Sequence, residues 1–127
     1  MNYTYPAVGA DYKKDECIFT VWAPGKKKVE LLLSHGPAQA MQQDERGFWS
    51  VTLRNVLPGD TYQYRIDNEK IFPDPASRQQ AETVHGLSTV VDPLGYEWRS
   101  AAWRGRPWRE AVLYELHTGT FSDSGDY

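Results

Sequence analysis

Short runs in which apolar and polar residues alternate fill the first two thirds of the chain, and this period of two argues against amphipathic helices. The runs are separated by turn sequences such as Pro24-Gly25 and Leu57-Pro58-Gly59-Asp60, the second of which fits a type II turn. Alternation of this kind is typical of half-buried antiparallel strands, and several short strands in series predict a β-sandwich. The strands are predicted at residues 16–24, 28–35, 47–53, 61–67 and 69–72.

The first of these strands carries apolar groups on both of its faces. Cys17, Phe19 and Val21 share one face, and Trp22 belongs to the other. Two apolar faces suit a central strand, so we expect Trp22 in the core. The strand at 28–35 is expected to pair with it, as its neighbour in sequence.

The 127 residues can build one ordinary core, and their charge argues against two classes of partner. The net charge is -3 and the isoelectric point is near 5.6, so no basic field attracts nucleic acid or an anionic membrane. No stretch reaches the roughly 20 apolar residues that span a bilayer. Cys17 is the only cysteine and can form no disulfide within the chain, which favours a cytoplasmic location.

The pattern changes after Pro73, where two prolines bracket Asp74 and disfavour both helix and strand. We therefore divide the chain into a β-sandwich at 1–93, a linker at 94–109 rich in tryptophan and arginine, and a last segment at 110–127. That last segment opens with an apolar stretch, "VLYEL", which predicts a buried strand.

Eight motifs occur in order along the chain: "FTVWAP", "GFWSVTL", "PGDTYQYRID", "PDPASR", "VHG", "VVDP", "WRGRP" and "YELHTGTF". The first three resemble the N-terminal sandwich domains of branching, debranching and trehalose-releasing enzymes, often grouped as carbohydrate-binding module family 48. The later motifs resemble the N-terminal region of the malto-oligosyltrehalose trehalohydrolases, within the α-amylase family of glycoside hydrolases. The resemblance covers almost the whole chain from about residue 8 onward.

This resemblance implies an immunoglobulin-like sandwich followed by a (β/α)₈ barrel, with "VLYELHTGTF" resembling the first barrel strand. The catalytic carboxylates of such enzymes come from later strands, so no catalytic residue is expected in this chain. Retaining glycosidases need two carboxylates about 5 Å apart at the ends of several barrel strands, and one strand cannot supply them. The implied partner is the enzyme's own barrel, and the implied substrate of the whole enzyme is maltooligosyl trehalose, from which it releases trehalose.

Two other interpretations remain open. The domain could come from a glycogen branching or debranching enzyme, or it could be a free-standing module that binds α-1,4-glucan by aromatic stacking. A general immunoglobulin-like interaction domain is a third, which the ordered motifs disfavour. The exposed terminal strand could also pair two copies of the chain.

The candidate site residues follow from these interpretations. No metal or cofactor is expected, because the histidines and the single cysteine lack ligand spacing and no glycine-rich turn opens a helix. For sugar binding the candidates are Trp49, Tyr62, Tyr64 and His85. For packing against the barrel they are Asp74, Arg78, Trp98, Trp103, Trp108 and Tyr114.

Overall fold

The computed structural model of the chain describes residues 4–68, 70–100 and 102–126. Its contacts divide the chain into two units, Met1–Tyr96 and Glu97–Tyr127. The first unit carries all the strands of the described residues. They are β1 (Gly9–Tyr12), β2 (Cys17–Trp22), β3 (Val29–Leu33), β4 (Gln39–Ala40), β5 (Gln42–Gln43), β6 (Phe48–Leu53), β7 (Thr61–Ile66), β8 (Lys70–Phe72) and β9 (Ser88–Thr89).

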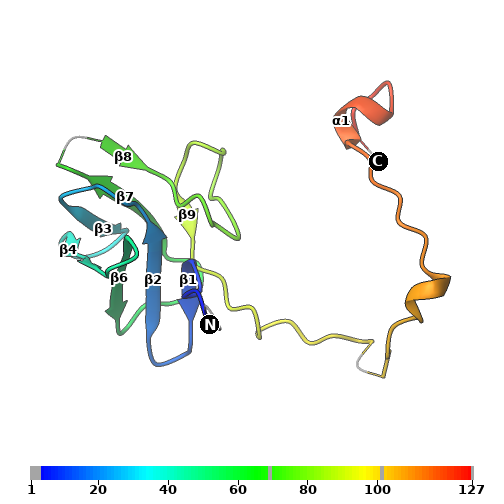
Figure 1. The fold of residues 1–127 in the computed structure, drawn as a ribbon, viewed down its shortest axis with the longest axis horizontal. Helices are drawn as coiled ribbons and strands as arrows, with labels where there is room; N and C mark the ends of the chain where they lie inside the picture. Colours follow the sequence, from blue (N-terminus) through cyan, green and yellow to red (C-terminus); the bar gives the residue numbers. More distant parts are fainter. Residues whose placement is uncertain (1–3, 69, 101, 127) are drawn as a thin grey trace. The chain divides into compact units, whose positions relative to one another are not determined.

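The strands form two antiparallel sheets, which confirms the predicted all-β sandwich (Figure 1). One sheet has the order β1-β2-β6-β5, and β2 lies at its centre as expected. The other has the order β4-β3-β7-β8, with β9 also paired to β7. The last predicted strand is seen as β8, and its expected first residue, Glu69, lies outside the described residues.

The predicted pairing of β3 with β2 is wrong. After β2 the chain crosses to the other sheet, where β3 pairs with β7 and β4. The carboxylate of Asp67 accepts hydrogen bonds from the backbone N–H groups of Lys27 and Lys28, at 2.9 and 3.1 Å. These bonds tie the crossover to the β7–β8 turn, so β2 and β3 do not form a hairpin.

The backbone angles describe the turns on both sides of β7. At the end of β7, Asp67 and Asn68 both have positive φ, a conformation that aspartate and asparagine adopt in turns more readily than most residues. In the turn before β7, Gly59 has a φ of 98°, and the N–H of Asp60 donates to the carbonyl of Leu57 at 3.1 Å. This geometry is the expected type II turn, in which glycine tolerates positive φ at the third position.

The core lies between the two sheets and is built mainly from alternate residues of β2, β3 and β7. Phe19 of β2 meets the ring of Tyr62 edge-on, with centroids 4.9 Å apart. Tyr62 in turn packs edge-on against Tyr64 at 5.9 Å. The buried apolar residues are Ala10, Cys17, Phe19, Val21, Ala23, Val29, Leu31, Met41, Trp49, Val56, Tyr62, Tyr64 and Val90.

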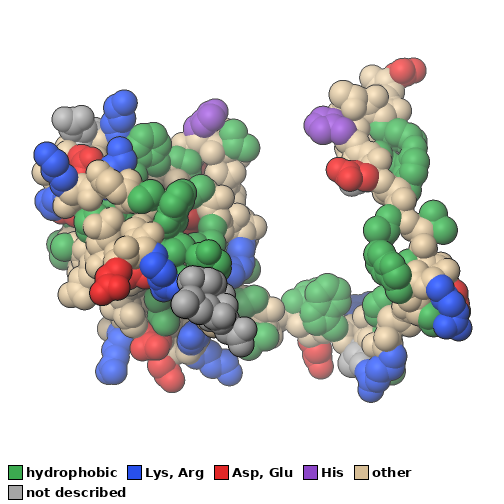
Figure 2. Space-filling model, viewed as in Figure 1, with side chains coloured by type: hydrophobic (Ala, Val, Ile, Leu, Met, Phe, Trp, Pro, Cys, Tyr) green, Lys and Arg blue, Asp and Glu red, His purple; other side chains and the backbone are tan. Residues whose placement is uncertain are grey.

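The second unit contains a 3-10 turn at Trp108–Glu110 and a short helix, α1 (Thr118–Phe121). The strand predicted after residue 111 is not formed in the described part of this unit. A strand needs a hydrogen-bonded neighbour, and none pairs with it here, so Val112 and Leu113 remain 92% and 78% exposed. Figure 2 shows apolar side chains along this segment.

Candidate functional site

Asp74 is an internal anchor that ties the segment after β8 to the core. Its side chain is buried, and one carboxylate oxygen accepts hydrogen bonds from the hydroxyls of Tyr62 at 2.7 Å and Tyr64 at 3.2 Å. The other oxygen accepts from the backbone N–H of Ala76 at 2.8 Å. The backbone N–H of Asp74 donates to the hydroxyl of Ser88 at 2.9 Å. Because the carboxylate is fully engaged inside the sandwich, it does not offer the interface contact expected from the sequence.

These contacts change the acidity of the two tyrosines. Burial, reinforced by the negative charge of Asp74, raises the pKa of Tyr62 and that of Tyr64 well above the ordinary value of 10. Both phenols therefore stay protonated near neutral pH and act as hydrogen-bond donors. Their role is structural, since a buried donor pair of this kind fixes the position of the carboxylate.

Three of the four predicted sugar-binding residues lie in the core. Trp49 is 6% exposed, and Tyr62 and Tyr64 are each 1% exposed. A sugar cannot stack on these rings because the sheets cover them, and alternation along β6 and β7 directs them inward. Only His85 is exposed, and the structure does not bring the four residues together on one surface.

Trp22 shows the opposite deviation from the sequence prediction. It was expected in the core, but its side chain is 59% exposed, because the inward face of β2 is already taken by Phe19 and Val21. The indole N–H donates to the carbonyl of Arg46 at 3.1 Å, which fixes the ring at the end of the strand. On the inner side, Trp49 uses its own indole N–H to donate to the carbonyl of Ala23 at 3.0 Å.

An aromatic hollow of about 580 Å³ lies beside Trp22 and is lined by Tyr5, Trp22, Arg46 and Phe48. Trp22 and Phe48 are directly paired across β2 and β6. The guanidinium of Arg46 lies 5.5 Å from the centre of the Phe48 ring, in a cation–π contact, and the Tyr5 ring lies 6.2 Å from the same ring. We call this the Trp22 hollow.

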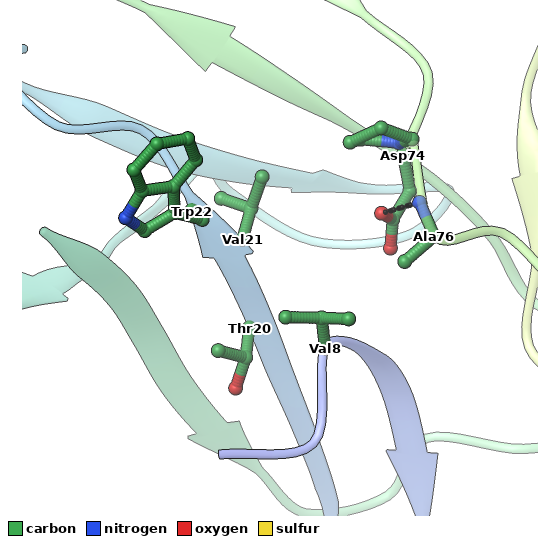
Figure 3. Close-up of a pocket in the computed structure, with 7 residues that line it drawn as sticks. Val8, Thr20, Val21, Trp22, Asp74 and Ala76 are labelled. Carbon is green, nitrogen blue, oxygen red and sulfur yellow. Dashed lines mark hydrogen bonds between the residues drawn. The ribbon is translucent and has the colours of Figure 1, made fainter. Parts of the chain in front are cut away.

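Two further hollows border Trp22. One of about 240 Å³ lies between β2 and the segment of Asp74, with Val8 beside it (Figure 3). The other, of about 420 Å³, has mostly apolar walls that include Phe72, and His85 lies at its edge. Trp22 therefore stands in the middle of a largely apolar surface at one end of the sandwich. Sequence reasoning missed this surface, because the two apolar faces of the predicted strand placed Trp22 in the core.

The remaining interface candidates fall in two places. Arg78 lies in the first unit, where its guanidinium donates to the carbonyl of Ala10 in β1 at 2.8 Å. The others lie in the second unit and share high exposure. The exposed fractions are 69% for Trp98, 69% for Trp103, 78% for Trp108 and 75% for Tyr114.

Within the described ranges, no three histidine, cysteine or acidic side chains lie close enough to share a metal ion. The described helices also include none with the length and apolar character to cross a membrane.

Comparison with known proteins assigns the family. The model of the family described as carbohydrate-binding module 48, the isoamylase N-terminal domain, matches residues 7–94. The chain belongs to this family. The sandwich of the carbohydrate-binding module 48 family corresponds to the unit that carries Asp74 and the Trp22 hollow.

The relatives confirm the resemblance expected from the motifs. The malto-oligosyltrehalose trehalohydrolase of Saccharolobus solfataricus is 40% identical over 91% of this chain, which corresponds to 21% of that enzyme. A solved structure of a candidate alpha amylase from Salmonella typhimurium is 41% identical, with a TM-score of 0.79 over 96% of this chain and 21% of that one. The chain thus spans about a fifth of the length of the relatives it matches.

A debranching enzyme is more distant. The type I pullulanase of Bacillus subtilis strain 168, solved in complex with maltose, is 27% identical, with a TM-score of 0.64 over 76% of this chain and 14% of that one. The trehalohydrolase of Saccharolobus solfataricus thus resembles this chain more than this pullulanase does.

Proposed function

We propose that this chain is the non-catalytic N-terminal domain of a trehalose-releasing glycoside hydrolase. The complete enzyme would cleave the α-1,4 bond next to the terminal trehalose of maltooligosyl trehalose. Support comes from the 40% identity to a trehalohydrolase against 27% to a pullulanase. Glycoside hydrolysis in a barrel requires a carboxylate pair that several barrel strands hold. The folded part of this chain is a sandwich, which agrees with a non-catalytic role.

The partner we propose is the catalytic barrel of the same enzyme. The observation that carries this is the exposed aromatic surface of the second unit, where Trp103, Trp108 and Tyr114 are at least 69% exposed. Each large apolar side chain removed from water contributes about 1.5–3 kcal/mol, so a neighbouring domain that covers them would be held firmly. The domain would then buttress the barrel.

A complementation experiment tests this role. A related trehalohydrolase is produced without the segment that matches this chain, and the two polypeptides are mixed. We expect them to elute together and to release more trehalose from maltooligosyl trehalose than the shortened enzyme alone, while this chain by itself releases none. Replacement of Trp103 and Trp108 by alanine should weaken the complex. Trehalose release by the isolated chain, or a failure of the two parts to associate, would contradict the proposal.

Sugar binding by the domain is a second proposed function. It is favoured by one observation, the exposed indole of Trp22 beside a hollow that also contains an arginine. Aromatic faces with a few polar groups are the usual construction of small-ligand sites. Titration with a maltooligosaccharide tests it.

We also propose a cytoplasmic location and a tendency to self-associate when the second unit is not covered. The lone buried Cys17 supports the first, and the exposed side chains of Val112 and Leu113 support the second. Fractionation of cells that express the complete gene tests the location. Sedimentation over a range of concentrations tests self-association, and a strictly monomeric chain would contradict it.

A further inference from the structure

We propose that two copies of this chain pair through β8, whose outer edge receives residues 112–116 of the other copy as an added strand. This inference rests on the self-association proposed above, and it adds the receiving surface and the register. Each copy carries both the edge and the segment. A reciprocal exchange therefore uses both in each copy and closes a symmetric dimer.

β8 is an open edge of its sheet. It pairs with β7 on one side, and among the described strands none pairs with its other side (Figure 1). Its three residues are all exposed, and the apolar side chains of Ile71 and Phe72 are 52% and 44% exposed. An exposed apolar edge strand presents unpaired backbone N–H and C=O groups, which are a template for a further strand.

The other edges of the two sheets are covered or short. In β1 the guanidinium of Arg78 donates to the carbonyl of Ala10 at 2.8 Å. In β9 the N–H of Thr89 donates to the carbonyl of Gln79 at 2.8 Å. β4 and β5 have two residues each, and neither carries a large apolar side chain. Among these edges, β8 is therefore the one that offers an apolar surface to another strand.

The segment 112–116 has the sequence of a strand but no sheet to join. It lies in no helix or strand, and its backbone forms no hydrogen bond with the backbone of another described residue. Its sequence, "VLYEL", includes residues that favour strands, and Val112, Leu113 and Tyr114 are exposed. Addition to a sheet edge would satisfy this backbone and cover these side chains at the same time.

Charge and hydrophobicity match β8 to this segment in one antiparallel register. The opposite pairs are Lys70 with Glu115, Ile71 with Tyr114 and Phe72 with Leu113. One ion pair and two apolar pairs are favourable combinations of directly opposite side chains. A shift by one residue would set Glu115 opposite the apolar Ile71 and lose the ion pair, so the charges select the register.

The same register brings a leucine to the hollow beside β8. Phe72 is paired with Tyr64 in β7, and both side chains line the hollow of about 420 Å³ described above. Directly opposite residues lie on the same face of a sheet, so Leu113 opposite Phe72 would face this hollow. Its walls are mostly apolar, which suits an aliphatic side chain and gives the added strand its specificity.

Sedimentation equilibrium tests the pairing by exchange of charges. We expect a dimer whose dissociation constant rises about fivefold in Lys70→Glu and in Glu115→Lys, because each variant sets like charges opposite each other. The double variant Lys70→Glu/Glu115→Lys should regain the wild-type value. Lys14→Glu is the matched control, since it makes the same change of charge in the exposed turn after β1, and it should associate like the wild type.

A mixture of two cysteine variants tests which residues meet between copies. Ile71→Cys and Tyr114→Cys replace exposed side chains, whereas the native Cys17 is buried and should not react in the folded chain. Opposite residues of a ladder have Cα atoms about 4.5–5.5 Å apart, within reach of a disulfide. Oxidation of the mixture should link position 71 of one copy to position 114 of the other, as detected by mass spectrometry of the peptides. Phe121→Cys, at another exposed aromatic residue, is the control for Tyr114→Cys and should give a several-fold lower yield.

The outcomes separate the surface from self-association itself. Association that is unchanged in both charge variants overturns the pairing at β8 and leaves the proposed self-association intact. A wild-type chain that stays monomeric up to about 1 mM overturns both, and leaves packing against the barrel untouched. If circular dichroism shows that a charge variant is unfolded, the mixed disulfide decides, and equal yields from Tyr114→Cys and Phe121→Cys overturn the surface.

Discussion

The hydroxyl of Tyr62 donates a 2.7 Å hydrogen bond to the buried carboxylate of Asp74, and this bond joins β7 to the segment that follows β8. Tyr64 donates to the same oxygen, and the N–H of Ala76 to the other. A single acidic side chain thus satisfies three buried or half-buried donors. It holds the edge of the hollow shown in Figure 3.

Replacement of Asp74 by alanine should lower the free energy of unfolding by about 3 kcal/mol, because it leaves the hydroxyls of Tyr62 and Tyr64 buried without an acceptor. Tyr62→Phe should cost about 1–2 kcal/mol, since it removes one donor and leaves Asp74 its other partners. Urea denaturation gives both values. Asp123→Ala, at an exposed position, is the control. Equal stability of Asp74→Ala and the control would refute the anchoring role.

The raised pKa values of Tyr62 and Tyr64 predict a loss of stability in alkali. Above pH 10 the unfolded chain releases these two protons while the folded chain keeps them, so the part of the stability that the two tyrosines contribute is full below pH 10 and falls as the pH rises. The expected slope is about 1.4 kcal/mol per pH unit for each tyrosine. Urea midpoints measured on both sides of this pH check it, and Tyr64→Phe should show a shallower decline. A flat profile would contradict the prediction.

Cys17 should react with thiol reagents only when the protein unfolds. Its side chain is fully buried, and burial, with a smaller effect from the charge of Asp11, raises the pKa of the thiol to about 12. The thiolate is therefore scarce and inaccessible in the folded chain. The rate of reaction with a colorimetric disulfide reagent, compared with and without urea, measures this. A fast reaction in native buffer would show that β2 opens readily.

Gly9→Ala should destabilise the chain more than Gly36→Ala. Both glycines have positive φ, at 91° and 93°, so each substitution carries the same backbone penalty of about 1 kcal/mol. A Cβ at Gly9 would also lie 2.9 Å from the carbonyl oxygen of Ala76, whereas one at Gly36 meets no atom within 4 Å. The difference between the two variants in urea denaturation isolates this contact. Equal losses would mean that β1 and the Asp74 segment separate easily.

Much of the sandwich could be predicted from the sequence, because alternation and turn chemistry are local signals. β2, β3, β6 and β7 lie where alternation places them, and the turn at Gly59 has the predicted form. The short strands β1, β4, β5 and β9 were missed. Strands of two to four residues give too few alternations to be recognised, and they exist because a neighbouring strand pairs with them.

The candidate site was harder to predict because burial depends on which sheet covers which face. Tyr64 and Trp49 are candidates for sugar binding from the sequence, yet they lie inside, and Trp22, expected in the core, lies outside. The pairing of β3 with β7 instead of β2 was missed for the same reason, because the residues of a strand do not show which of the two sheets the strand joins. Asp74 stands out in the sequence because it belongs to the "PDPASR" motif. Its hydrogen bond from Tyr62 could not be predicted, because the two residues belong to different segments of the chain.

The crossover from β2 to β3 also affects how the chain folds. The central pairs of the two sheets join Cys17 to Leu53 and Val29 to Ile66, so neither sheet can form from neighbouring hairpins alone. Loop closure must come before most of the core contacts, which is the condition for slow folding. During synthesis β2 would lack its partner β6, and β3 its partner β7, until the ribosome has delivered those strands. A chaperone that shields β2 and β3 in that interval would be expected to raise the yield of folded protein.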